Sequence, residues 1–284
     1  MVLGHEGVGV VEKVGPDVRM LKKGDRVGWG YNTNSCGLCL RCLEGEDVFC
    51  AERGIYGSVT HDQGSMSSMA VWREAFLHTI PDNLSDEVAA PLQCAGATVF
   101  TTLYGVKPNE TVAVMGVGGL GHLAIQFAAK LGCRVVVLSG SDNKKDEAMK
   151  LGAHDFIAMK SLDKDGKDGP LRGEIDRLVV TTSAQPNWSQ ILPMMATKST
   201  IYPLSVDSGN FEIPYLPLIL TGISIKGSLV ATRAYHREML DFAAQHNIKP
   251  ITETFPMTEE GITAAIDKLN SGKLHFRAVL KSQL

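Results

Sequence analysis

The sequence predicts an α/β protein in which a β-rich region precedes a parallel sheet covered by helices. In residues 1–90, short β-branched runs are separated by turns containing Gly, Pro, Asp or Asn, which is typical of short strands. From residue 111 onward, short apolar runs alternate with helical segments, and this alternation indicates βαβ units. A chain of 284 residues is long enough for two domains with separate cores.

The individual elements follow from local residue patterns. In the β-rich region, strands are expected at 8–11, 26–29, 70–72 and 76–80. The segment from Ser85 to Leu103 predicts a helical region, interrupted near Pro91 because proline removes a helix hydrogen bond. Further strands are expected at 111–115, 134–138, 156–157, 177–181, 200–204, 224–227 and 277–280. Helices are expected at 119–131, 142–151, 235–246 and 260–271, and the charged segment 160–175 is expected to be a surface connection.

Composition and charge exclude several classes of protein. The 28 Lys and Arg residues and 31 Asp and Glu residues give a net charge of −3 without a long run of one sign, so no nucleic-acid-binding surface is expected. With 44% hydrophobic and 21% charged residues, the chain is not of the disordered class. No apolar run approaches the roughly 20 residues of a membrane span, and no signal peptide opens the chain. We therefore expect a cytoplasmic protein that binds neither membranes nor nucleic acids.

Four of the six cysteines are crowded into residues 36–50. The spacing Cys36-x2-Cys39-x2-Cys42-x7-Cys50 offers four soft ligands, and zinc binds such thiolates as a closed tetrahedral shell in structural sites. The alternatives are two disulfides or four unrelated buried thiols. A cytosolic chain disfavours disulfides, and unrelated thiols do not explain the clustering. The sequence therefore predicts a structural zinc lobe, with no open coordination position for catalysis.

A glycine-rich turn is predicted between the strand at 111–115 and the helix at 119–131. The G-x-G-x-x-G pattern of dinucleotide-binding sites matches this turn, Gly116-Val117-Gly118-Gly119-Leu120-Gly121. Gly116 would permit the tight turn, Gly118 would let the backbone approach a pyrophosphate, and Gly121 would allow the helix to pack closely on the strand. The alternative is a tight turn without a ligand. The preceding strand and the following helix favour a bound dinucleotide.

The end of the second strand indicates which dinucleotide is bound. An NAD site has Asp or Glu about 20 residues after the glycines, where it holds the ribose 2′-hydroxyl. Here the strand ends in Ser139-Gly140-Ser141, which tolerates a 2′-phosphate, and Lys144 or Lys145 would supply positive charge. The alternative for the two lysines is a solvated helix surface. The sequence favours NADP(H) over NAD(H).

A second set of metal-ligating residue types is dispersed along the chain. His5 and Glu6 lie far upstream of Cys94. Taken singly, these residues are explained as a turn histidine, a surface carboxylate and a buried helix cysteine. Taken together, an imidazole and a thiolate with an open coordination position are what catalytic zinc uses to polarise a carbonyl or an alkoxide.

These motifs together resemble those of the zinc-dependent medium-chain alcohol dehydrogenases, most closely the NADP-dependent branch similar to cinnamyl alcohol dehydrogenases. The resemblance covers essentially the whole chain. It depends on Gly4-His5-Glu6, the four-cysteine lobe, Gln93-Cys94-Ala95-Gly96-Ala97-Thr98, the glycine-rich turn, the segment 139–145 and Phe276-Arg277-Ala278-Val279.

The resemblance implies a fold and a reaction. A Rossmann domain with a doubly wound parallel sheet, residues 91–229, would bind NADP(H). It would be inserted into a β-rich, GroES-like catalytic domain made of residues 1–90 and 230–284, with the active site in the cleft between the domains. The reaction would be reversible hydride transfer between NADP(H) and an alcohol/aldehyde pair, with zinc stabilising the alkoxide.

The resemblance also implies roles for single residues. His5 and Cys94 would be ligands of a catalytic zinc, and Glu6 would be a neighbouring carboxylate or an alternative ligand. Thr98 would lie near the nicotinamide, and Arg277 near the coenzyme pyrophosphate. The substrate would be a small alcohol or aldehyde.

The chain departs from the family pattern at its beginning. In the family, several dozen residues precede the His-Glu pair and include a cysteine that is the first ligand of the catalytic zinc. Here Met1-Val2-Leu3 alone precede Gly4, and Cys133 opens the second strand of the parallel sheet, where a buried thiol is the ordinary explanation. We therefore expect an N-terminally truncated chain that holds the catalytic zinc through three protein ligands and whose activity is in question.

Two other functions stay open. One is a non-catalytic protein that binds zinc and NADP(H). The other is a reductase of activated C=C bonds, a reaction of some relatives in which conjugate hydride addition need not use zinc. The apolar segment 213–225 is expected to be a late strand region of the coenzyme domain that pairs with a second subunit, which would make the protein a homodimer.

Overall fold

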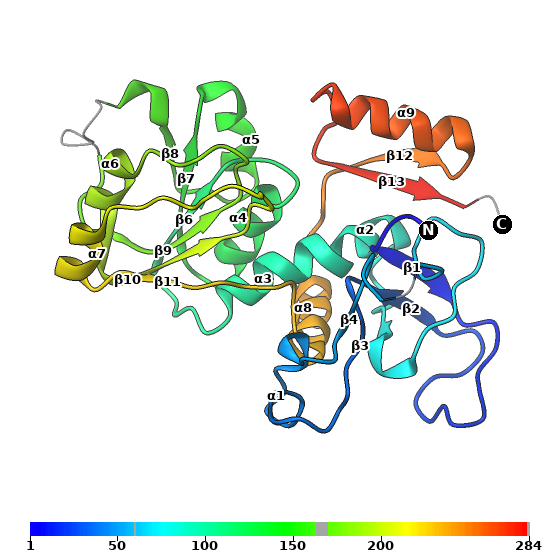
Figure 1. Ribbon diagram of the computed structural model, residues 1–284. Helices are drawn as coiled ribbons and strands as arrows, with labels where there is room; N and C mark the ends of the chain where they lie inside the picture. The colour runs from blue at the N-terminus through cyan, green and yellow to red at the C-terminus, as the bar shows by residue number, and fades with distance from the viewer. Residues whose placement is uncertain (60, 163–169, 283–284) are drawn as a thin grey trace. The chain divides into compact units, whose positions relative to one another are not determined.

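The computed structural model describes all residues except 60, 163–169 and 283–284, and it divides into two compact units (Figure 1). Unit 1 comprises Met1–Thr98 and Leu229–Leu284, and unit 2 comprises Val99–Ser228. Unit 2 is therefore one continuous piece of chain inserted into a discontinuous unit 1. Among the described residues, no helix has the length and apolar character needed to cross a membrane.

The β-rich part of unit 1 is made of short antiparallel strands. They are β1 (Gly7–Val10), β2 (Arg26–Trp29), β3 (Asn32–Asn34), β4 (Gly54–Ile55) and β5 (His78–Thr79). One sheet has the order β1-β2-β5, and β3 pairs with β4. Gly7 lies opposite Trp29, and a Cβ at Gly7 would be 2.2 Å from the indole ring, so glycine lets the ring lie flat on β1.

The remaining elements of unit 1 are mostly helical. They are α1 (Leu40–Leu43), α2 (Asp86–Pro91), a π-helical turn (Leu92–Gly96), the beginning of α3 (Ala97–Leu103), α8 (Arg233–His246), α9 (Glu259–Asn270) and the parallel strands β12 (Thr252–Pro256) and β13 (Arg277–Lys281). The hydroxyls of Thr232 and Thr258 accept hydrogen bonds from backbone N–H groups of the first turns of α8 and α9, at 3.3 and 3.2 Å. Such caps satisfy donors that the helix itself leaves unpaired.

Unit 2 contains a six-stranded parallel sheet with the order β11-β10-β9-β6-β7-β8. Its strands are β6 (Thr111–Met115), β7 (Arg134–Ser139), β8 (Asp155–Ala158), β9 (Ile175–Val180), β10 (Met195–Pro203) and β11 (Ser224–Ile225). The chain moves outward from β6 to β8, returns to place β9 beside β6, and continues outward to β11. The loops after β6 and β9 therefore diverge at a switch point, which is where sheets of this kind bind ligands.

Helices cover both faces of this sheet. They are α4 (Gly121–Lys130), α5 (Lys145–Lys150), α6 (Trp188–Ile191) and α7 (Tyr215–Thr221), with α4 and α5 on one side and α6 and α7 on the other (Figure 1). The central strands are consequently apolar on both faces. Val112, Val114 and Val136 are fully buried, as are Ile175 and Leu178.

The structure confirms the α/β class and the doubly wound sheet, with strands at 111–115 and 134–139 and a change of helix type next to Pro91. The strand expected at 70–72 is wrong: this segment joins no ladder, and Val71 is 87% exposed. The strand region expected at 213–225 is also wrong except at β11, because Tyr215–Thr221 form the helix α7. The sequence reasoning missed β3, β4, β12, α1 and α6. Part of the expected surface connection, residues 163–169, lies outside the described residues.

Candidate functional site

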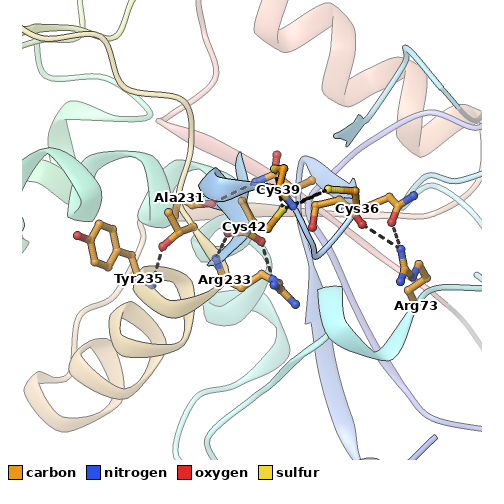
Figure 2. A network of polar contacts seen from close by, with 12 residues as sticks. Cys36, Cys39, Cys42, Arg73, Ala231, Arg233 and Tyr235 are labelled. Atoms are coloured by element: carbon orange, nitrogen blue, oxygen red, sulfur yellow. Dashed lines mark hydrogen bonds and ion pairs between the residues drawn. The ribbon is translucent and has the colours of Figure 1, made fainter. Parts of the chain in front are cut away.

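The four cysteines of residues 36–50 come together in unit 1. Their ligand atoms all lie within 4.8 Å of one another, and Figure 2 shows three of the side chains converging. The Sγ atom of Cys36 lies 3.9 Å from that of Cys42 and 3.5 Å from that of Cys50, and the Sγ atoms of Cys39 and Cys42 are 3.6 Å apart. A tetrahedral zinc with Zn–S bonds of about 2.3 Å requires Sγ–Sγ distances of about 3.8 Å, whereas a disulfide requires about 2.0 Å. The quartet therefore has the dimensions of a zinc site, and all four thiols are free.

The local backbone also prepares this site for a metal. The N–H groups of Leu38 and Cys39 point at the Cys36 sulfur, at 3.5 and 3.3 Å. Together with the Cys50 thiol, these donors lower the pKa of Cys36 to about 7, which favours the thiolate that binds zinc. The loop reverses at Gly37 and Gly45, whose φ angles of 75° and 81° lie in the region open to glycine.

Polar contacts fasten the four-cysteine lobe to the rest of unit 1 (Figure 2). The buried carboxylate of Asp47 accepts hydrogen bonds from the Arg233 side chain at 2.5 Å and from the Arg233 backbone N–H at 3.4 Å. The Asn32 amide donates to the Ala231 carbonyl at 3.1 Å, and Arg73 donates to the Asn34 side chain. The beginning of α8 thus holds the lobe from one side. Sequence reasoning missed these residues, since their partners lie up to 199 positions away.

The glycine-rich turn of unit 2 follows β6. Gly116 has a φ of 98°, and its carbonyl oxygen would lie 1.9 Å from a Cβ at Gly121, so both positions need glycine. The single proton of the Thr181 hydroxyl is shared between the Met115 and Gly116 carbonyl oxygens, which lie 2.9 and 3.2 Å from the hydroxyl oxygen. A Cβ at Gly118 would meet no protein atom within 4 Å. The turn is therefore closed where helix meets strand and open at the position predicted to approach a pyrophosphate.

The residues predicted to determine whether NADP(H) or NAD(H) is bound lie beside this turn. Ser139 ends β7, the strand next to β6, and Ser141 precedes the short 3-10 turn Asp142–Lys144. The Lys144 ammonium group donates to the Val117 carbonyl at 2.6 Å. Gly119 and Leu120 complete the turn before α4 begins at Gly121. The sheet thus brings the predicted phosphate-binding and ribose-binding residues to one edge.

In unit 1, His5 and Glu6 lie among aromatic and charged residues. The His5 ring centroid is 5.5 Å from that of Tyr31 and 5.1 Å from that of Tyr56. Burial lowers the pKa of His5 although Glu6 opposes this shift, so the neutral imidazole is favoured. The Glu6 carboxylate accepts a hydrogen bond from the Ala95 backbone N–H at 3.1 Å and forms an ion pair with Arg277.

Cys94 lies in the π-helical turn, close to the same carboxylate. Burial, with a smaller effect of Glu6, raises the pKa of its thiol to about 12, and its side chain makes a hydrogen bond with Thr98. Glu6 therefore acts electrostatically on both His5 and Cys94. Among the described residues, the four-cysteine quartet is the one group of metal-ligating side chains whose atoms gather within 4.8 Å, and His5, Glu6 and Cys94 do not form a second.

Comparisons with known proteins agree with this architecture. Residues 1–82 match the family model described as "Alcohol dehydrogenase GroES-like domain", and residues 119–245 match "Zinc-binding dehydrogenase". A probable formaldehyde dehydrogenase of Bacillus subtilis is 38% identical to this chain, and the match covers 99% of this chain and 81% of the relative. Cinnamyl alcohol dehydrogenase 8 of Arabidopsis thaliana is 35% identical, and the match covers 99% of this chain and 79% of the relative.

Solved structures give the same result. A cinnamyl alcohol dehydrogenase of Sorghum bicolor has a TM-score of 0.87 at 31% identity. The match covers 98% of this chain and 81% of the Sorghum chain. A cinnamyl alcohol dehydrogenase of Helicobacter pylori, solved in complex with NADP(H), has a TM-score of 0.83 at 26% identity over 99% and 81%. The chain belongs to the zinc-dependent medium-chain alcohol dehydrogenase family and resembles its cinnamyl alcohol dehydrogenases.

Proposed function

We propose that the protein transfers hydride reversibly between NADP(H) and a small alcohol/aldehyde pair. The observation that carries this proposal is the glycine-rich turn after β6, which is open at Gly118 and lies at the switch point of a doubly wound sheet. In this proposal unit 2 binds the coenzyme and unit 1 carries the catalytic residues. Relatives named as alcohol dehydrogenases support the substrate class.

The preference for NADP(H) is supported by the residues beside the turn. Ser139 and Ser141 offer hydroxyl groups where NAD-binding proteins have a carboxylate, and Lys144 lies near enough to donate to the turn itself. A 2′-phosphate placed here would receive charge-assisted hydrogen bonds. A relative named NADP-dependent alcohol dehydrogenase C 1, from Mycolicibacterium smegmatis, is 33% identical over 99% of this chain.

We further propose two zinc sites. The quartet Cys36, Cys39, Cys42 and Cys50 fits a structural ion by its sulfur spacing. His5, Glu6 and Cys94 fit a second ion by their chemistry, since a neutral imidazole, a carboxylate and the thiolate that Cys94 would form by releasing its proton on metal binding are all zinc ligands. Zinc bound there would stabilise negative charge on the alcohol oxygen. Arg277 holds the Glu6 carboxylate, and Thr98 holds the Cys94 side chain.

The coenzyme assignment is tested by replacing Lys144. We expect Lys144→Ala to lower kcat/KM about tenfold or more further for NADPH than for NADH, since only NADPH carries the 2′-phosphate, whereas loss of the Lys144 bond to the Val117 carbonyl affects both coenzymes alike. Lys150→Ala removes an exposed charge from the same helical segment and serves as the matched control. Equal losses with both coenzymes would contradict the assignment. Cinnamaldehyde as substrate, with product analysis, distinguishes aldehyde reduction from reduction of the C=C bond.

A second candidate function is binding of zinc and NADP(H) without turnover. It is favoured by the side chains of His5, Glu6 and Cys94, whose ligand atoms do not gather within 4.8 Å in the described structure. Metal analysis and NADPH fluorescence separate the two candidates. Two zinc ions for each chain and steady turnover support the dehydrogenase, whereas one zinc ion and NADPH binding without turnover support the binding protein.

We also propose that the protein is a cytoplasmic homodimer. Free thiols in the four-cysteine lobe suit a reducing compartment. In unit 2, α7 directly precedes the edge strand β11 and carries exposed apolar residues: Tyr215, Leu216, Ile219 and Leu220, each at least 64% exposed. An exposed apolar cluster beside a free sheet edge is typical of a subunit interface.

Charge placed in this cluster is expected to separate the subunits. Leu220→Glu should convert a dimer into a monomer in sedimentation velocity, because the carboxylate would lose its water on association. Leu269→Glu, which changes an exposed leucine of α9 in unit 1, is the control and should leave the dimer intact. A wild-type protein that sediments as a monomer would refute the proposal.

A further inference from the structure

The π-helical turn that carries Cys94 contains a completely buried amide side chain, that of Gln93. Its Nε2 atom donates a hydrogen bond to the Ala89 carbonyl at 3.0 Å. This bond fixes the orientation of the amide, so its Oε1 atom faces the other way, toward His236 at 3.0 Å from Nε2 of that ring. An amide with both ends engaged in a buried site costs little desolvation and specifies a single conformation.

Two glycines of the adjacent strand region make room for Gln93. A Cβ at Gly28, in β2, would lie 2.3 Å from the carbon of the Gln93 amide group. A Cβ at Gly30 would lie 2.3 Å from the Gln93 backbone carbonyl oxygen. The side chain and the backbone of Gln93 therefore both lie against positions where any larger residue would collide. The sequence Gly28-Trp29-Gly30 is explained by this close approach.

His236 holds the amide from the side of α8. Its ring is 4% exposed and stacks on the buried ring of His78 with centroids 3.7 Å apart and an interplanar angle of 12°. Because Oε1 of Gln93 can only accept, Nε2 of His236 carries the proton. Burial lowers the pKa of His236 to about 3, so the ring is a neutral donor at physiological pH. A residue on α8 is thereby connected to the residue directly before Cys94.

We propose that His236 is a positioning residue, whose hydrogen bond to Gln93 holds the π-helical turn in the conformation that places Cys94 beside Glu6 and Thr98. A π-helical turn is an uncommon, wider helical turn that is often found at functional sites, and it persists where neighbouring side chains stabilise it. Without the bond, the turn loses the polar contact that connects Gln93 to α8. The importance of this role for catalysis rests on the proposed function, but the role itself does not.

Alkylation of Cys94 tests the proposal independently of activity. His236→Phe keeps a stacking ring and removes the donor. Gln93→Met removes the acceptor and also the Nε2 donor to the Ala89 carbonyl, so His236→Phe is the more specific of the two variants. In both variants we expect iodoacetamide to modify Cys94 about tenfold faster, measured by mass spectrometry against the buried Cys133 thiol of unit 2 as internal reference. His236→Gln restores a donor and should return the rate to near the wild-type value. His78→Phe keeps the stacked pair and the Gln93 bond, and should leave the rate unchanged.

Kinetics give a second measurement where the protein turns over. Displacement of Cys94 should lower kcat more than it changes KM for NADPH, because the coenzyme turn belongs to unit 2. Unchanged alkylation in His236→Phe and Gln93→Met would overturn the proposal, as would a His236→Gln rate equal to that of His236→Phe. If one of the two variants fails to fold, the other decides. If both fail to fold, the pair is a core contact of unit 1 and the positioning role is overturned. Faster alkylation in a protein without turnover would uphold the positioning role and reject the dehydrogenase proposal alone.

Discussion

Replacing Cys50 by serine is expected to release the zinc ion of the four-cysteine lobe and to destabilise unit 1. The Cys50 side chain is completely buried, and its sulfur lies 3.5 Å from that of Cys36. Among the described residues, the group of ligand atoms within 4.8 Å of one another consists of these four cysteines and has no fifth member. Structural zinc contributes about 10–16 kcal/mol of binding free energy in zinc-finger peptides. Loss of one ligand should therefore lower the free energy of unfolding of unit 1 by about 3 kcal/mol or more.

Metal analysis and thermal unfolding measure this effect. The variant should contain one zinc ion fewer for each chain than the wild type, and its unfolding midpoint should be lower. Cys133→Ser is the matched control, because it also changes a buried thiol but lies in unit 2, away from the lobe. Its zinc content should equal that of the wild type. An unchanged zinc content in Cys50→Ser would show that the quartet does not bind the metal.

Substitution of Gly121 is expected to have the second large effect. An alanine Cβ at this position would lie 1.9 Å from the Gly116 carbonyl oxygen and 3.0 Å from the Gly116 carbonyl carbon. Both are backbone atoms, so no side-chain rotation relieves the collision, and α4 has to move away from β6. We expect Gly121→Ala to lower the free energy of unfolding of unit 2 by about 3 kcal/mol or more and to abolish NADPH binding.

Gly118→Ala separates a coenzyme site from a tight turn without a ligand. The added Cβ would meet no protein atom within 4 Å, so the unfolding midpoint should stay near that of the wild type. If a pyrophosphate lies against this backbone, the same methyl group should weaken NADPH binding about tenfold or more in a fluorescence titration. Unchanged NADPH affinity in this variant would mean that the phosphates bind elsewhere.

The elements that could be predicted from sequence are those whose residues carry their own pattern. Strands β6 and β7 are apolar on both faces because helices cover both, and the result is continuous runs such as Val135–Leu138. Strands β3 and β12 have no such signal. The polar strand β3 is held by Asn32, whose amide reaches Ala231 across 199 positions, and β12 is held by parallel pairing with β13. Val71 lies in a run that favours a strand, but it pairs with no strand among the described residues, and its carbonyl accepts a hydrogen bond from the Gln63 side chain instead.

The candidate sites divide in the same way. The spacing of the four cysteines predicts that their sulfur atoms come together, since a short loop can bring four nearby thiols into one site. His5, Glu6 and Cys94 depend on tertiary structure: Glu6 binds the backbone of a residue 89 positions away and the side chain of Arg277, 271 positions away. Gln93 belongs to one of the motifs on which the family resemblance depends, but no motif predicts its contact with His236. A buried Gln beside a predicted ligand, with glycines at 28 and 30, was the signal that could have found them.

The discontinuity of unit 1 sets an order for folding during synthesis. Unit 2 is continuous, so all of its contacts are available once the ribosome has passed Ser228. The four-cysteine lobe is synthesised early. However, Asp47 binds Arg233, which is synthesised 186 residues later, and Gln93 binds His236, which is synthesised 143 residues later. The first 98 residues therefore leave the ribosome without their final partners, and unit 1 is completed after unit 2. A metal ion bound by the four thiols would order residues 36–50 before α8 has been synthesised.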